Sequence, residues 1–169
     1  MSIALYDLSV ATFARFLRAL DANLGTLAAH CAEKKIEPGV FVAARLFPDM
    51  FPLSGQVQLA CDFAKNASAR LAGVEPPAHP DTEQTLDELK ARIAKTLAFI
   101  EGLDRAAIDA GADRIVKFRM GPETWVDMPG AQYLTGFALP NFYFHATTAY
   151  AILRHNGLPL GKRSFFGMA

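Results

Sequence analysis

The fold of this chain is decided by residues 5–31, whose sequence is LYDLSVATFARFLRALDANLGTLAAHC. Its apolar side chains recur alternately four and three positions apart, at Tyr6, Val10, Phe13, Leu17, Leu20, Leu24, Leu27 and Cys31. An α-helix turns once every 3.6 residues, so this spacing places all of them on one face, as in a helix bundle. Arg15, Arg18 and Asp21 fall on other faces, where they would meet solvent. The stretch therefore predicts a long amphipathic helix that packs against other helices.

A second helix is predicted over residues 54–71. Its small and apolar side chains share one face, at Val57, Ala60, Cys61, Ala64, Ser68 and Leu71. Gly73 suits the left-handed position that closes a helix. The two prolines at 76 and 77 then prevent the helix from resuming.

A third helix is predicted to begin at Asp81 and to end at Gly102, with a stripe of leucine and isoleucine along one face. Asp81 and Gln84 have the spacing of a capping box, which would satisfy the free backbone N–H groups at the helix start. Glu88 and Arg92 lie four positions apart, and we expect them to form an ion pair on the outer surface.

The remaining segments complete the expected fold. Residues 34–52 are broken by prolines and glycine, which predicts an ordered crossover loop after the first helix. Residues 114–128 alternate around a Gly-Pro turn and predict a small β-hairpin. The last helix should start near Pro140 and stop at Asn156-Gly157, followed by a tail that docks. The fold class is therefore all-α: a four-helix bundle with a long crossover loop and a small β-hairpin before the last helix, in one domain over residues 1–169.

Composition limits the partners and the location. Lysine plus arginine and aspartate plus glutamate both number 17, so the formal net charge is +0. A balanced chain without a basic stripe has no general attraction to nucleic acid or to anionic membranes, and we expect neither partner. No secretory signal and no long apolar run is visible, so we expect a cytoplasmic protein. Cys31 and Cys61 fall on apolar helix faces and are expected to be buried free thiols.

His145 is the residue that most suggests chemistry. At 100° per residue it shares a face with Phe142, Ala149 and Ile152, so the imidazole should point into the bundle. It is either a core histidine satisfied by one hydrogen bond, or a ligand or acid–base group in an interior pocket. On the second helix, Gln56 lies at the margin of the apolar face, where either a structural or a functional role is open.

Asp62 and Lys65 lie together on another face of the same helix. A solvated or bundle-edge polar stripe is the simpler explanation for them, because surface ion pairs are common and weak. Trp125 and the aromatic run 142–144 are expected to be core or interface residues.

Two stretches of the chain are similar to a known family. They are Pro48-Asp49-Met50-Phe51-Pro52-Leu53 with Gln56-Val57-Gln58, and residues 139–157. The sequence resembles an uncharacterised, domain-of-unknown-function branch of the DinB/YfiT-like putative metalloenzymes. That resemblance implies a four-helix bundle, often dimeric, in which one histidine of helix two and two of helix four hold a divalent metal. It also implies that the chain shares a superfamily with metal-dependent thiol transferases that use bacillithiol or mycothiol.

The sequence departs from that metal-binding pattern. His145 can stand for one ligand of the last helix, but Thr148 and Ala149 occupy the positions three and four residues beyond it. The helix-two position is Gln56 or Gln58, and one imidazole with an amide cannot make a tight zinc or nickel site. We therefore expect no metal and no other cofactor.

Two functional hypotheses follow from these residues. The first is a metal-free, small-molecule-binding or non-catalytic relative with an interior pocket near His145. The second is a transferase-type enzyme, thiol-dependent and with or without a metal, in which His145 is the catalytic base. The candidate ligand-binding residues are His145, Gln56, Tyr150 and Asp62. We expect a homodimer, because the aromatic-rich sequence leaves apolar surface to bury.

Overall fold

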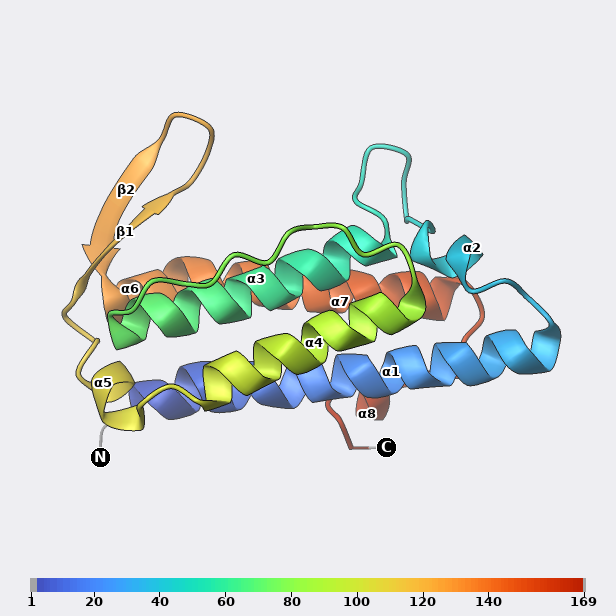
Figure 1. Cartoon of the computed structure of the whole chain (residues 1–169), viewed down its shortest axis with the longest axis horizontal. Coiled ribbons are helices and arrows are strands. Elements are labelled where there is room, and N and C mark those ends of the chain that lie inside the picture. Colours follow the sequence, from blue (N-terminus) through green and yellow to red (C-terminus); the bar gives the residue numbers. More distant parts are fainter. Residues whose placement is uncertain (1–2, 169) are drawn as a thin grey trace.

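The computed structural model describes residues 3–168 and contains four long helices packed side by side in a ring (Figure 1). They are α1 (Thr12–Lys34), α3 (Leu53–Ala72), α4 (Leu86–Glu101) and α7 (Leu139–His155). Helix α1 packs between α4 and α7, and α3 packs against the same two helices from the opposite side. The predicted four-helix bundle is thus confirmed.

The chain direction of the helices explains the long crossover. In Figure 1, α1 and α7 run one way and α3 and α4 run the other, so the neighbours α3 and α4 are parallel. Helix α3 has 20 residues and is about 30 Å long, and extended chain advances about 3.3 Å per residue. Residues 73–85 therefore return along the bundle as an extended segment, which we call the crossover segment. The sequence placed the crossover at residues 34–52, but there the chain turns back through the short α2 (Gly39–Val42) at one end of the bundle.

The start of α4 also differs from the prediction. Thr85, rather than Asp81, is the residue that caps it: its hydroxyl accepts from the Glu88 backbone, and the Glu88 carboxylate accepts from the Thr85 backbone. The reason is that residues 81–84 belong to the extended crossover segment. The capping-box chemistry was expected, but it lies four residues further along the chain.

The predicted hairpin lies at the end of the bundle where α7 begins. After the short α5 (Arg105–Asp109), strand β1 (Ile115–Arg119) pairs antiparallel with β2 (Trp125–Pro129), with Lys117 opposite Asp127. The alternation is confirmed, because Val116 and Phe118 are buried whereas Lys117 and Arg119 are exposed. The chain then continues through α6 (Gly130–Tyr133) and a π-helical turn, Leu134–Ala138, directly into α7.

One apolar core runs through the bundle and includes the predicted seam of α1. Phe13 and Phe142 meet edge to face with ring centres 4.8 Å apart. The C-terminal tail docks as expected: it forms α8 (Lys162–Phe165), and Phe165 and Phe166 pack against Phe16 of α1. Within residues 3–168, no helix has both the length and the apolar character that crossing a membrane requires.

Candidate functional site

Gln56 and His145 come together in the interior between α3 and α7. Gln56 lies in the first turn of α3 and His145 in the second turn of α7, and both side chains are buried. The Gln56 Oε1 atom lies 2.9 Å from His145 Nδ1. The sequence had named both as candidate ligand-binding residues, with Gln56 as a possible partner of His145, and the packing of α3 against α7 makes them direct partners.

The hydrogen bonds of Gln56 fix the proton on the imidazole. Gln56 Nε2 donates to the Phe51 carbonyl at 3.1 Å, and a carbonyl can only accept. The amide oxygen must then face His145, so Nδ1 carries the proton and donates it to Gln56. In the neutral ring this leaves the lone pair on Nε2, which makes no hydrogen bond within the described residues and is not sealed from solvent.

The surroundings keep the His145 ring neutral. Burial lowers the pKa of His145 from 6.5 to about 4, because the charged form would lose its hydration. The Phe63 ring stacks on the imidazole with centroids 5.6 Å apart and planes inclined by 16°. At neutral pH the site therefore offers an uncharged nitrogen base behind an aromatic side chain.

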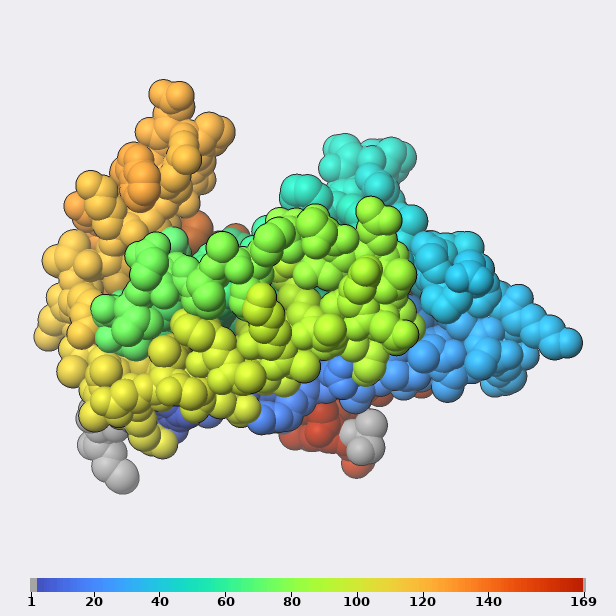
Figure 2. Space-filling model, in the orientation of Figure 1, coloured from blue at the N-terminus to red at the C-terminus, as the bar shows by residue number. Residues whose placement is uncertain are grey.

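Phe63 separates His145 from a surface hollow of about 330 Å³. The apolar part of its wall comes from Leu59 and Phe63 of α3, Phe137 before α7, and Trp125 of the hairpin. Phe63 and Phe137 pack edge to face at 5.8 Å. We call this space the hairpin hollow. Figure 2 shows that the hairpin and the connection between α2 and α3 project from the same side of the bundle, with a depression between them.

The polar part of the hairpin hollow is dominated by two arginines. Arg70 of α3 and Arg119 of β1 line it, together with Asn66 and Asp62 of α3. Arg70 Nη1 donates to the Tyr133 hydroxyl at 2.8 Å. The Arg119 guanidinium lies 5.7 Å from the centre of the Trp125 ring.

Asp62 belongs to a charge network rather than to a solvated stripe. Its Oδ1 lies 2.9 Å from Lys65 Nζ and 3.0 Å from Arg92 Nη2, as ion pairs without good hydrogen-bond alignment. Lys65 and Arg92 are both buried. The predicted outer pair of Glu88 with Arg92 is wrong, because Arg92 points inward and Glu88 caps α4.

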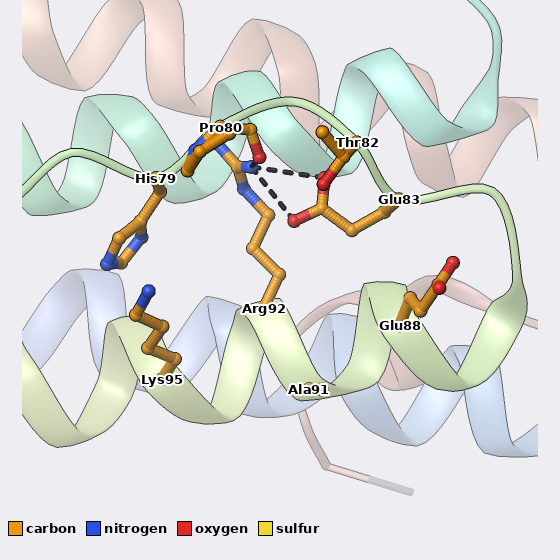
Figure 3. A pocket seen from close by; sticks show the side chains of 8 residues that line it. All are labelled: His79, Pro80, Thr82, Glu83, Glu88, Ala91, Arg92 and Lys95. Atoms are coloured by element: carbon orange, nitrogen blue, oxygen red, sulfur yellow. Dashed lines mark hydrogen bonds and ion pairs between the residues drawn. The ribbon is translucent and has the colours of Figure 1, made fainter.

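Arg92 fastens the crossover segment to the bundle, as Figure 3 shows. Its Nη1 donates to the Pro80 carbonyl at 3.1 Å and to Glu83 at 3.0 Å, and its Nη2 pairs with Asp81 at 2.9 Å. His79 lines a separate hollow beside Arg92, and its Nδ1 is buried without a hydrogen-bond partner among the described residues. This cluster is mainly structural, since its charges satisfy one another.

Tyr150, the fourth candidate, lies apart from His145. Five positions along an α-helix correspond to a rotation of about 140°, which puts the two residues on different faces of α7. The Tyr150 ring packs edge to face against Phe165 of the docked tail at 5.7 Å. The structure therefore joins His145 to Gln56, places Asp62 on the edge of the hairpin hollow, and leaves Tyr150 in a separate contact.

Comparison with known proteins assigns the family. A family model described as "Domain of unknown function (DUF1993)" matches residues 5–166. The chain belongs to the DUF1993 family. It is also similar to a crystal structure described as a DinB family member protein from Shewanella denitrificans, with 41% sequence identity over 96% of this chain and 92% of that chain and a TM-score of 0.89. The resemblance to an uncharacterised DinB-like branch is thus confirmed. No curated protein matches the chain.

The side chains of this DUF1993 protein do not fit the three-histidine metal site that the DinB resemblance implies. Gln56 stands opposite His145, and its amide oxygen accepts the imidazole proton. Thr148 donates to the Phe144 carbonyl at 2.7 Å, and Ala149 has no ligand atom. Within residues 3–168, no three His, Cys, Asp or Glu side chains gather in a way suited to a metal ion.

Apart from Asp62, sequence reasoning missed the residues that line the hairpin hollow. Phe63 and Arg70 lie seven residues apart on α3, whereas Phe137 is distant in the chain, and their local pattern does not distinguish them from core or surface positions. Trp125 was assigned to the core or an interface but is largely exposed. The one usable signal was the alternation of β1, which already placed Arg119 on the outer face of the hairpin.

Proposed function

We propose that this DUF1993 protein binds a small molecule in the hairpin hollow without the help of a metal. The observation that carries the proposal is the position of Phe63, whose ring lines the hollow and stacks on the buried, neutral His145. The volume of about 330 Å³ lies within the range of small-molecule sites, and the wall combines an aromatic part with a charged and polar part. The Gln56–His145 hydrogen bond holds the imidazole in place behind the Phe63 ring.

Binding can be measured with the chain's single tryptophan, which lines the hollow. The wild-type protein is titrated with single-ring compounds that carry an anionic, a neutral or a cationic group, and Trp125 emission is recorded. At least one compound should give a saturable change. Phe63→Ala should raise its half-saturation concentration about tenfold, because tenfold corresponds to about 1.4 kcal/mol, close to what covering a partly exposed aromatic side chain contributes.

Phe99→Ala is the matched control, since Phe99 lies on α4 and does not line the hollow. It should leave the half-saturation concentration unchanged. If no compound alters Trp125 emission, or if both variants weaken binding equally, the hollow is not a ligand site.

The free Nε2 of His145 favours a second function, that of a thiol-dependent transferase with His145 as general base. Its neutral imidazole has the lone pair that a general base needs, and its pKa of about 4 makes it a weak base toward a thiol. The wild type and His145→Ala are compared with bacillithiol or mycothiol and an electrophile, both before and after incubation with zinc or nickel. Equal background rates in all samples would contradict this function, and a tightly held metal lost in the variant would contradict metal-free binding.

The homodimer also stays a prediction. Several large apolar side chains are exposed on α2, on the connection between α2 and α3 and on α7, namely Val40, Phe47, Phe51 and Phe144. Sedimentation velocity at micromolar concentration should give the mass of two chains. A sedimentation coefficient of a single chain would contradict the prediction.

A further inference from the structure

The hairpin hollow has two chemically distinct sides. Phe63, Phe137 and Trp125 supply aromatic surface from three different segments of the chain. Arg70 and Arg119 supply positive charge from α3 and from the hairpin. Such a combination suits a flat apolar body that carries an anionic group at one edge, because an aromatic wall favours rings and guanidinium favours carboxylate.

Arg119 is the cation with the most unused hydrogen-bonding capacity. No described carboxylate forms an ion pair with it, and its recorded neighbour is the Trp125 ring at 5.7 Å. Guanidinium has five N–H donors in a planar fork that matches the two oxygens of a carboxylate. Arg70 uses one of its N–H groups for the Tyr133 hydroxyl, which fixes its direction and leaves the others free.

Asp62 does not cancel this positive charge. Its carboxylate lies between Lys65 and Arg92, both buried, at 2.9 Å and 3.0 Å. Lys65 compensates Asp62, and Arg92 divides its charge among Asp62, Asp81 and Glu83. Two of the three charged residues that line the hollow are arginines, so the net charge of its wall is positive and attracts anions.

We propose that the ligand of the hairpin hollow is a small carboxylate with a planar apolar body, and that Arg119 holds its carboxylate. This inference rests on the proposed function, since it names the ligand class of the same site. The aromatic side chains would enclose the apolar body, and Trp125 would lie against it with Arg119 beside its ring.

Three single-ring probes test the charge preference. Benzoate, benzamide and benzylamine share one ring and differ in the charge of the substituent. In titrations of the full chain followed by Trp125 emission, benzoate should bind about tenfold more tightly than benzamide, because a charge-assisted hydrogen bond exceeds a neutral one. Benzylamine should bind more weakly still. Added salt should weaken benzoate binding, since part of the attraction is electrostatic.

Arg119→Gln and Lys117→Gln form a matched pair of variants. Both residues lie on the exposed face of β1, each has its charge within 6 Å of the Trp125 ring, and Lys117 does not line the hollow. Arg119→Gln should raise the half-saturation concentration for benzoate about tenfold and leave that for benzamide nearly unchanged. Lys117→Gln should leave both unchanged, and circular dichroism should show the same helix content in all three proteins.

The outcomes separate the two proposals. If benzamide or benzylamine binds as tightly as benzoate, or if both variants behave alike, the carboxylate inference is wrong while the small-molecule site stands. If none of the three probes changes Trp125 emission at millimolar concentration, both the inference and the proposed function fail.

Discussion

His145 makes the folded protein sensitive to acid. Its pKa is about 4 in the folded chain and about 6.5 when the imidazole is hydrated. Between these values the unfolded chain binds a proton that the folded chain does not. The free energy of unfolding should therefore fall as the pH drops from about 6.5 to about 4, and this loss should level off below pH 4.

Urea unfolding at a series of pH values measures this effect. His145→Gln removes the titrating ring and should flatten the dependence over that window. His79 adds a second contribution of the same sign, because burial also lowers its pKa. A slope that stays the same in His145→Gln would show that the folded chain protonates His145 without penalty.

Arg92 makes most of the polar contacts that hold the crossover segment against the bundle. Arg92→Leu would leave Asp62, Asp81 and Glu83 without their shared cation. We expect a loss of about 2 kcal/mol in the free energy of unfolding, measured by urea denaturation, because the partly buried Asp62 and Glu83 lose a charged hydrogen-bonding partner. Amide hydrogen exchange should become faster in residues 73–85.

The exposed pair of Arg18 with Glu101 provides the control for Arg92. Arg18→Leu should change the free energy of unfolding by less than about 1 kcal/mol, as is usual for surface ion pairs. Equal losses in the two variants would mean that the Arg92 network does not hold the crossover segment.

A pair of variants also tests which residue caps the start of α4. Thr85→Ala removes the hydroxyl that accepts from the Glu88 backbone and should cost about 1 kcal/mol of unfolding free energy. Gln84→Ala should cost little, because only the backbone of Gln84 takes part in the cap. Thermal denaturation of both variants would distinguish Thr85 from the neighbouring residues as the cap.

The packing of the whole molecule depends on glycines where the hairpin meets α3. A Cβ atom on Gly130 would collide with the Gly111 carbonyl and with the Leu71 side chain. Gly130→Ala should therefore lower the melting temperature, as expected when a close backbone approach is blocked. It should also disturb the hairpin hollow and its ligand binding.

Gly25→Ala should stabilise the protein, in contrast to Gly130→Ala. Gly25 lies within α1, and nothing stands within 4 Å of the Cβ position. Alanine there should raise the unfolding free energy by up to about 1 kcal/mol, because it costs less chain entropy in a helix. If both glycine variants destabilise the protein equally, the collision at Gly130 is not the cause.

The sequence by itself determined the four helices, the hairpin and the inward direction of His145. These features depend on neighbours within one or two turns: apolar spacing, Gly and Pro stops, and strand alternation. The same local information placed Gln56 at the margin of an apolar face.

Only the tertiary structure decided which helices are parallel, where the crossover runs and what surrounds His145. Arg92 shows why: four positions from Glu88 it has the spacing of a surface pair, but packing turns it inward to meet residues 62, 81 and 83. The hairpin hollow likewise combines side chains from three separate parts of the chain: Phe63 and Arg70 of α3, Arg119 and Trp125 of the hairpin, and Phe137 before α7. Contacts between distant segments arise from the burial of apolar area as a whole, which no local pattern encodes.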